Sequence, residues 1–255
     1  MKKTAIVTGA SSGIGREISR VLVEMGYEVY GFGREFPEEE SEQIRTKQDP
    51  VEMIGTENGT DKQNQENGML HRIVCDLLDT PELERQIKEI RRENEVSLLV
   101  NNAGVGYYGL HEELNVQKIQ KLVRTNLEVP MVLTNLLLRD LKKYGGIVIN
   151  ISSVTAQLSN PHGCAYGATK AGLSSFSRSL FDEVRKYGVR VVTIQPDMTK
   201  TDLYRNADFA QGEEEDSYLL PEEVAGAVQD ILRMRKGVVV TEITLRPQLH
   251  RIRRK

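Results

Sequence analysis

Two side chains four residues apart could carry acid–base chemistry in this chain. Tyr166 and Lys170 lie in a segment with a helical pattern, residues 165–186, so both side chains project from one face of the expected helix. A phenol beside an ammonium is a proton donor whose anion the positive charge stabilises. Such a pair suits a step in which negative charge develops on an oxygen atom. Because composition alone yields a Tyr-x3-Lys pair in roughly every second chain of this kind, its surroundings must support it.

A serine provides part of that support. Ser153 stands thirteen positions before Tyr166, just beyond a β-branched run at residues 147–151 that predicts a strand. Its hydroxyl could hold the oxygen atom that receives the proton. Ser152 is adjacent and chemically identical, so the residues alone leave both serines open.

A proline singles out one further residue, Asn126. Pro130 lies inside a helical pattern at residues 116–143, and proline has no N–H to offer the carbonyl of Asn126, four residues earlier. That carbonyl is therefore free to bind water, and a kink is expected there. A kink without a part in catalysis is the alternative interpretation.

A glycine-rich turn, T-G-A-S-S-G-I-G at residues 8–15, lies between a predicted strand at 5–7 and a helical pattern at 14–24. Its glycines permit a tight turn, a close approach to a pyrophosphate and close packing of the helix, whose N-terminus offers free N–H groups. The context predicts a dinucleotide site. The residues expected to contact the cofactor here are Gly9, Ser11, Ser12, Gly13, Ile14 and Gly15.

Together, the G-x-x-x-G-x-G spacing and the order N-I-S-S, then Y-x-x-x-K, resemble the short-chain dehydrogenase/reductase superfamily. Residues 101–104, N-N-A-G, follow the fourth predicted strand, where the family carries that motif, and Asp76 follows the third, where a family aspartate meets the adenine. The resemblance runs in order from Thr4 to about Leu245. It implies that the cofactor also contacts Asp76, Asn102, Ala103 and Gly104.

The resemblance also implies roles for the reacting residues. Tyr166 would be the general acid/base of a hydride transfer between a ketone and an alcohol. Ser153, which the family's spacing to the tyrosine favours over Ser152, would hold the substrate oxygen. Lys170 would bind the nicotinamide ribose, and Asn126 would hold a water that links Lys170 to solvent. Lowering the phenol pKa by about three units takes roughly 4 kcal/mol, which Lys170 and the positive nicotinamide could jointly supply.

The end of the second predicted strand should determine the choice of cofactor. A carboxylate there accepts hydrogen bonds from the adenosine ribose in NAD enzymes. In this chain Gly33 falls at that position, and Arg34 follows it with a planar fork suited to a 2′-phosphate. We therefore predict NADP(H) over NAD(H). The alternative is that Arg34 merely pairs with Glu35 on the surface.

The segment after the sixth predicted strand resembles the family only in part. Pro196 and Thr201 match a proline and a threonine that lie against the nicotinamide, and Thr199 is a further candidate contact. The family usually has glycine after the proline, where this chain has Asp197.

The elements that position these residues alternate between strand and helix. Strands are predicted at 5–7, 28–32, 72–74, 98–100, 147–151, 189–194 and 238–245, and helices at 14–24, 81–93, 116–143, 165–186 and 221–234. This alternation predicts an α/β fold: a Rossmann-type doubly wound parallel sheet of about seven strands with helices on both faces, in three layers. We expect a single domain, 1–255, with a polar insertion at 35–67 and a frayed or subunit-contacting basic tail at 250–255.

Composition excludes several other classes. The formal net charge is −3, so nucleic acid is not an expected partner. Two cysteines and four histidines without paired ligand spacing predict no metal site. No run approaches the roughly 18 apolar residues of a membrane span, and the start lacks the roughly 7–15 apolar residues of a secretory leader. We therefore expect a cytoplasmic protein without a membrane partner.

The substrate is expected to lie under a lid at residues 201–220, which holds Tyr204, Phe209, Tyr218 and Leu219, with Tyr107 and Tyr108 nearby. These side chains suit an apolar ring ketone such as a steroid. A 3-oxoacyl thioester is the alternative substrate, although the acidic run at 213–216 disfavours an acidic carrier protein. A catalytically silent dinucleotide-sensing regulator is the alternative of a different class. The resemblance also implies a homodimer or homotetramer.

Overall fold

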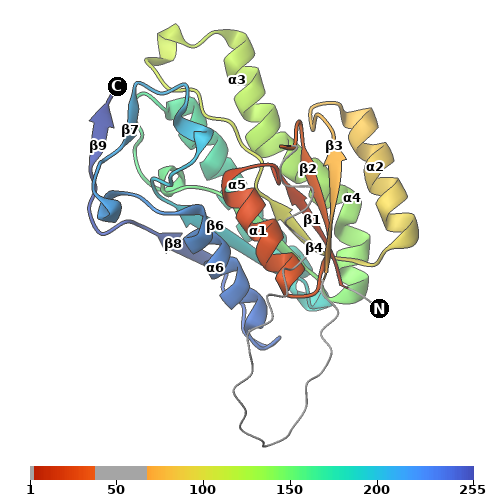
Figure 1. Ribbon diagram of the computed structural model, residues 1–255. Helices are drawn as coiled ribbons and strands as arrows, with labels where there is room; N and C mark the ends of the chain where they lie inside the picture. Colours follow the sequence, from red (N-terminus) through yellow and green to blue (C-terminus); the bar gives the residue numbers. More distant parts are fainter. Residues whose placement is uncertain (1–2, 38–67) are drawn as a thin grey trace, which may run out of the picture.

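The computed structural model of the protein describes residues 3–37 and 68–255 (Figure 1). The polar insertion expected at 35–67 falls outside the described residues from position 38 onward.

Seven parallel strands form the central sheet, in the order β3-β2-β1-β4-β5-β6-β8. Their runs are apolar because helices cover both faces of a parallel sheet. The strands are β1 (Thr4–Thr8), β2 (Glu28–Gly33), β3 (Met69–Val74), β4 (Val96–Asn101), β5 (Ile147–Ile151), β6 (Arg190–Pro196) and β8 (Glu242–Leu245).

Alternating side chains of each strand enter two separate cores. Ala5 and Val7 pack towards α1 (Gly13–Glu24) and α6 (Pro221–Arg233), which lie in front of the sheet in Figure 1. Ile6 packs towards the opposite layer. That layer contains α2 (Thr80–Glu93), α4 (Val129–Tyr144) and α5 (Cys164–Val184). The predicted three-layer Rossmann-type fold is therefore confirmed.

The strand order reverses between β1 and β4, because β2 and β3 lie on one side of β1 and β5, β6 and β8 lie beyond β4. In doubly wound sheets, ligands bind outside the carboxyl ends of the strands at such a switch point. The glycine-rich turn follows β1 and the N-N-A-G motif begins at the end of β4, so both lie at this point.

Two predicted elements differ from the structure. The helix expected at 116–143 is divided into α3 (Val116–Val123), a π-helical turn (Arg124–Glu128) and α4. The strand expected at 238–245 begins only at Glu242, where pairing with β6 begins opposite Thr193.

The basic tail is ordered, contrary to the expectation of fraying. Residues Ile252–Arg254 form β9, which pairs antiparallel with β7 (Phe209–Gln211) inside the expected lid. Short 3-10 turns at Asp202–Tyr204 and Glu215–Ser217 flank β7. Within residues 3–37 and 68–255, no helix is long and apolar enough to cross a membrane.

Candidate active site

A cavity of about 270 Å³ opens at the carboxyl ends of the parallel strands. All the predicted catalytic and cofactor-binding residues line it except Gly15 and Asn126. Of the side chains expected to surround the substrate, Tyr107 and Tyr204 line it, whereas Tyr108, Phe209, Tyr218 and Leu219 do not. The predicted residues that line it are Gly9, Ser11, Ser12, Gly13, Ile14, Arg34, Asp76, Asn102, Ala103, Gly104, Ser153, Tyr166, Lys170, Pro196, Thr199 and Thr201.

The glycine-rich turn needs its glycines for backbone reasons. Gly9 and Gly13 have φ angles of +67° and +52°, in the left-handed region that other residues rarely adopt. At Gly15 a Cβ would lie 2.1 Å from the Gly9 carbonyl oxygen, so this glycine closes the helix onto the turn. The free N–H groups at the start of α1 border the cavity, an arrangement that fits a pyrophosphate.

Asn102 braces this turn. Its side-chain amide donates to the carbonyl oxygens of Thr8 (2.9 Å) and Gly9 (3.3 Å). The Thr8 hydroxyl in turn accepts from the backbone N–H groups of Asn102 and Ala103, both at 3.0 Å. Asn102 therefore holds the end of β1 against the end of β4, and Thr8 is a functional position that the sequence reasoning missed.

A carboxylate side chain at the end of β2 would require its neighbours to move. A Cβ at Gly33 would lie 3.0 Å from both Phe36 and Ser11. Arg34 is exposed at the cavity wall, and within the described residues no ion pair joins it to Glu35. At the end of the neighbouring strand β3, Asp76 accepts from the backbone N–H of Leu78 at 3.0 Å. Arg34 thus keeps its guanidinium available for an anionic group.

The reacting residues are buried together. Tyr166 and Lys170 are each 4% exposed and Ser153 is 7% exposed. Burial raises the pKa of the Tyr166 phenol to about 12, and a hydrogen bond with Ser153 acts in the opposite direction. Burial lowers the pKa of Lys170 to about 8, and its ammonium donates to the Ile151 carbonyl at 2.8 Å. The chain's own groups therefore keep the phenol protonated at neutral pH.

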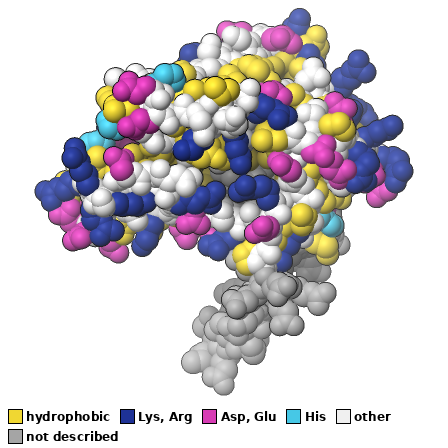
Figure 2. Space-filling view, turned by 90° about the horizontal axis from the view of Figure 1, so that it is seen from above, with side chains coloured by type: hydrophobic (Ala, Val, Ile, Leu, Met, Phe, Trp, Pro, Cys, Tyr) yellow, Lys and Arg dark blue, Asp and Glu magenta, His cyan; other side chains and the backbone are white. Residues whose placement is uncertain are grey.

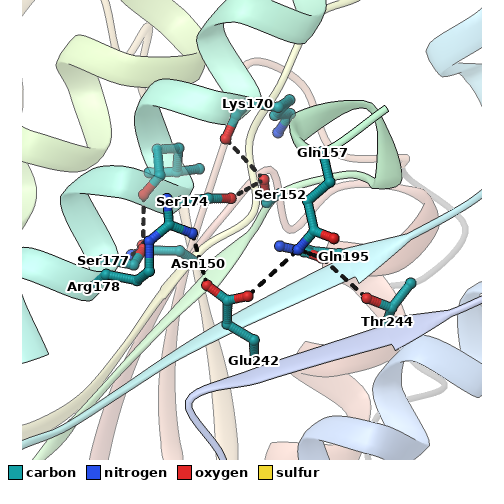
Figure 3. A network of polar contacts seen from close by, with 11 residues as sticks. Asn150, Ser152, Gln157, Lys170, Ser174, Ser177, Arg178, Gln195, Glu242 and Thr244 are labelled. Atoms are coloured by element: carbon teal, nitrogen blue, oxygen red, sulfur yellow. Dashed lines mark hydrogen bonds and ion pairs between the residues drawn. The ribbon is translucent and has the colours of Figure 1, made fainter. Parts of the chain in front are cut away.

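The two adjacent serines do different things. Ser152 donates to the backbone carbonyl of Lys170 at 3.0 Å and shares a hydrogen bond with Ser174 at 2.9 Å. Figure 3 shows it between these two partners. Ser152 therefore fixes the backbone of α5, whereas Ser153 has the hydroxyl beside Tyr166.

Asn126 lies in the π-helical turn, which supplies the irregularity expected before Pro130. Its fully buried side chain accepts from the backbone N–H of Val105 and donates to the Val105 carbonyl, both at 2.9 Å. It also donates to the Thr169 hydroxyl at 3.2 Å, which ties it to α5. Asn126 thus joins the N-N-A-G segment to the helix that carries Tyr166 and Lys170.

Asp197, the departure from the family pattern, is accommodated by an ion pair. Its carboxylate lies 3.1 Å from Arg246 and also accepts from the backbone N–H of Met198 at 2.9 Å. In the described part of the chain, His162 is the one non-glycine residue with positive φ, so position 197 does not need glycine. Thr201 follows with its methyl group 3.1 Å from where a Cβ on Gly13 would lie.

Comparison with known proteins agrees with this geometry. Residues 3–211 match the family described as short chain dehydrogenase. The chain belongs to this family. Short-chain dehydrogenases are oxidoreductases, so the predicted enzyme class is confirmed.

The relatives of this short-chain dehydrogenase differ in their reported activities. It is 31% identical to a 3-oxoacyl-[acyl-carrier-protein] reductase of Escherichia coli, over 80% of this chain and 76% of that one. It is also 31% identical to a serine 3-dehydrogenase of Agrobacterium fabrum, over 80% and 74%. An alcohol dehydrogenase from Thermococcus sibiricus, solved with 5-hydroxy-NADP, superposes with a TM-score of 0.79 at 27% identity, covering 98% of each chain.

Aromatic rings cover the reacting tyrosine of this short-chain dehydrogenase. The ring of Tyr108 lies 5.7 Å from that of Tyr166, and Tyr204 and Phe209 pack on Tyr108 at 5.9 and 5.1 Å. Burial raises the pKa of the Tyr108 phenol well above its usual value. Tyr204 lines the cavity, and Tyr108 and Phe209 pack against it without lining the cavity themselves. The Figure 2 view, from above Figure 1, shows hydrophobic side chains exposed among charged ones on this face.

Proposed function

We propose that this dehydrogenase uses NADP(H) to interconvert a ketone and a secondary alcohol. The observation that carries this proposal is the burial of Tyr166, Ser153 and Lys170 in one cavity with the glycine-rich turn. When bound, the cofactor supplies the hydride. The turn and the start of α1 would hold its pyrophosphate, and Arg34 its 2′-phosphate.

In this proposal the chain's residues control the proton. Ser153 holds the substrate oxygen, and Tyr166 donates its phenolic proton to that oxygen as negative charge develops on it. Lys170 binds the nicotinamide ribose, and its positive charge stabilises the phenolate that remains. The raised pKa of Tyr166, about 12, keeps the phenol protonated at neutral pH, so that a proton is present to donate. The reverse oxidation would need Lys170 and the positive nicotinamide to lower the phenol pKa jointly.

An apolar ring ketone, such as a steroid, is the proposed substrate. Tyr108, Tyr204 and Phe209 support it, because flat apolar rings pack well against aromatic side chains. A 3-oxoacyl thioester is the second candidate, supported by the names of several relatives. The acidic lid no longer argues strongly against it, since Glu213 and Glu214 are paired with arginines.

A substrate screen tests the proposed function. Cyclic and aromatic ketones, hydroxysteroids and 3-oxoacyl thioesters should be offered with each cofactor while NADPH or NADH absorbance is followed. We expect turnover with NADPH and a ring ketone. A preference for thioesters would select the second candidate. No turnover with any compound and either cofactor, despite measurable NADPH binding, would favour the silent regulator instead.

We also propose that residues 1–255 act as one domain in a cytoplasmic homodimer or homotetramer. The cavity supports the single domain, because residues from Gly9 to Asn206 line it. Light scattering tests the assembly, and a monomeric mass would contradict it.

A further inference from the structure

A short antiparallel ribbon joins the lid, residues 201–220, to residues 249–255, here called the strap. Phe209 pairs with Arg254 and Gln211 with Ile252 in the β7–β9 register (Figure 1). The backbone N–H of Gly212 donates to the Arg251 carbonyl at 3.1 Å. Further bonds at 2.8 Å join Lys255 to Asp208 and Leu249 to Asp216.

Opposite charges line the two sides of this ribbon. Arg251 pairs with Glu214, and Arg253 lies 3.6 Å from Glu213. The Lys255 ammonium donates to the backbone carbonyl of Tyr204 at 2.8 Å. Figure 2 shows basic and acidic side chains gathered at the left edge of this face. The acidic run of the lid and the basic tail are therefore two halves of one contact.

The ribbon is connected to the reacting tyrosine through aromatic rings. Phe209 lies in β7, and its ring meets that of Tyr108 edge-on at 5.1 Å. Tyr204, whose carbonyl the strap holds, stacks on Tyr108 at 5.9 Å. Tyr108 in turn lies 5.7 Å from Tyr166. A displacement of the strap would therefore move Tyr204 and Phe209, which contact Tyr166 through the single ring of Tyr108.

The contacts that hold the strap are individually weak. An isolated two-stranded ribbon is only marginally stable, and exposed ion pairs change an equilibrium by at most about five-fold each. Side chains of both arginines are 60% exposed, which allows salt to screen them. The position of the lid should therefore depend on the charges of the strap.

We infer that the strap is a positioning segment, which holds Tyr204 and Phe209 in place and thereby sets the affinity of the enzyme for its ketone. The affinity part of this inference rests on the proposed function. The strap touches neither the glycine-rich turn nor Arg34 in the described contacts, so cofactor binding should be independent of it.

The test combines hydrogen exchange of the lid with steady-state kinetics. In the variant Arg251→Glu with Arg253→Glu, exchange of lid amides such as Gly212 should accelerate by up to about five-fold for each lost pair. KM for the best ketone should rise by a similar factor, with kcat and NADPH affinity unchanged. Arg254→Glu is the matched control for each single reversal, Arg251→Glu or Arg253→Glu, since it makes the same charge change in the strap at a side chain with no ion pair among the described residues.

Rescue and salt provide independent checks. Adding Glu214→Arg to Arg251→Glu restores an opposite-charge pair and should restore slow exchange and low KM. In the unaltered protein, raising NaCl from low to molar concentration should accelerate lid exchange but not exchange in β5. This salt measurement does not require any variant to fold.

Three results would overturn the inference. The first is a rate of lid hydrogen exchange that changes with neither salt nor charge reversal. The second is faster lid exchange with an unchanged KM. The third is an effect of Arg254→Glu on exchange and KM equal to that of the reversals at Arg251 and Arg253. If the unaltered enzyme reduces no ketone, the proposed function fails and the affinity claim fails with it. The lid-exchange result then still decides whether the strap positions the lid.

Discussion

Replacing Arg34 with alanine should weaken the use of NADPH and leave the use of NADH unchanged. Arg34 lies at the cavity wall beyond β2 and has no ion pair with Glu35 to lose. At Gly33, a Cβ would already lie 3.0 Å from Phe36 and Ser11, so a ribose-binding carboxylate is absent and would not fit without displacement. In the proposed function, the guanidinium is therefore the group expected to distinguish the two cofactors.

The size of the effect follows from the kind of contact. A hydrogen bond to a charged group contributes about 1.5–3 kcal/mol, and solvent screening at the exposed Arg34 places the expected value near the lower end. Each 1.4 kcal/mol is a factor of ten, so kcat/KM for NADPH should fall by about ten-fold.

The assay is steady-state reduction of one ketone with each cofactor in turn. Arg139→Ala is the matched control, because Arg139 is exposed on α4 and does not line the cavity. An unchanged ratio of kcat/KM for NADPH over NADH in Arg34→Ala would refute the assignment. An equal loss with both cofactors would also refute it, since that pattern indicates a general defect.

Three further predictions concern other parts of the cavity. Lys170 has a pKa of about 8 and loses its charge as pH rises through that value, so the rate of ketone reduction should decline above about pH 8. A rate that stays constant above this pH would contradict the role of Lys170. Gly9→Ala should weaken NADPH binding by at least about ten-fold in a titration. Gly9 has a φ angle of +67°, which costs an alanine roughly 1–2 kcal/mol, and the new Cβ would lie 2.9 Å from the Asn102 amide and displace that side chain. Unchanged binding would contradict the need for glycine. Ser152→Ala should lower Tm by about 2–8 °C, because it removes buried hydrogen bonds that contribute roughly 1–3 kcal/mol to the free energy of unfolding. Ser153→Ala should instead lower kcat with little change in Tm. The opposite pattern would contradict the roles assigned to the two serines.

Local spacing made much of the fold and site predictable. The glycines of the first turn, Tyr166 and Lys170 are close in sequence, and their spacing reflects one turn or one helix face. Strand and helix alternation is likewise local, because each βα unit buries its own apolar side chains. These features can therefore be interpreted without knowing which distant segments meet.

The parts that escaped prediction depend on contacts between distant residues. Thr8 braces Asn102, 94 positions away, and Asp197 pairs with Arg246, 49 positions away. Nothing in the local sequence of either partner indicates the other. The local sequence of the basic tail predicts a frayed or subunit-contacting end, because its acidic partners lie in the lid, far away in the sequence. Their opposite charges were the one available signal.

Tyr166→Phe tests the central claim most directly. Phenylalanine keeps the ring that packs 5.7 Å from Tyr108 and removes only the hydroxyl that would deliver the proton. General acid catalysis typically contributes about 10²–10⁴-fold, so ketone turnover should fall by at least that much while NADPH binding and Tm stay close to those of the unaltered enzyme. Retained turnover in a folded, NADPH-binding Tyr166→Phe enzyme would contradict the account.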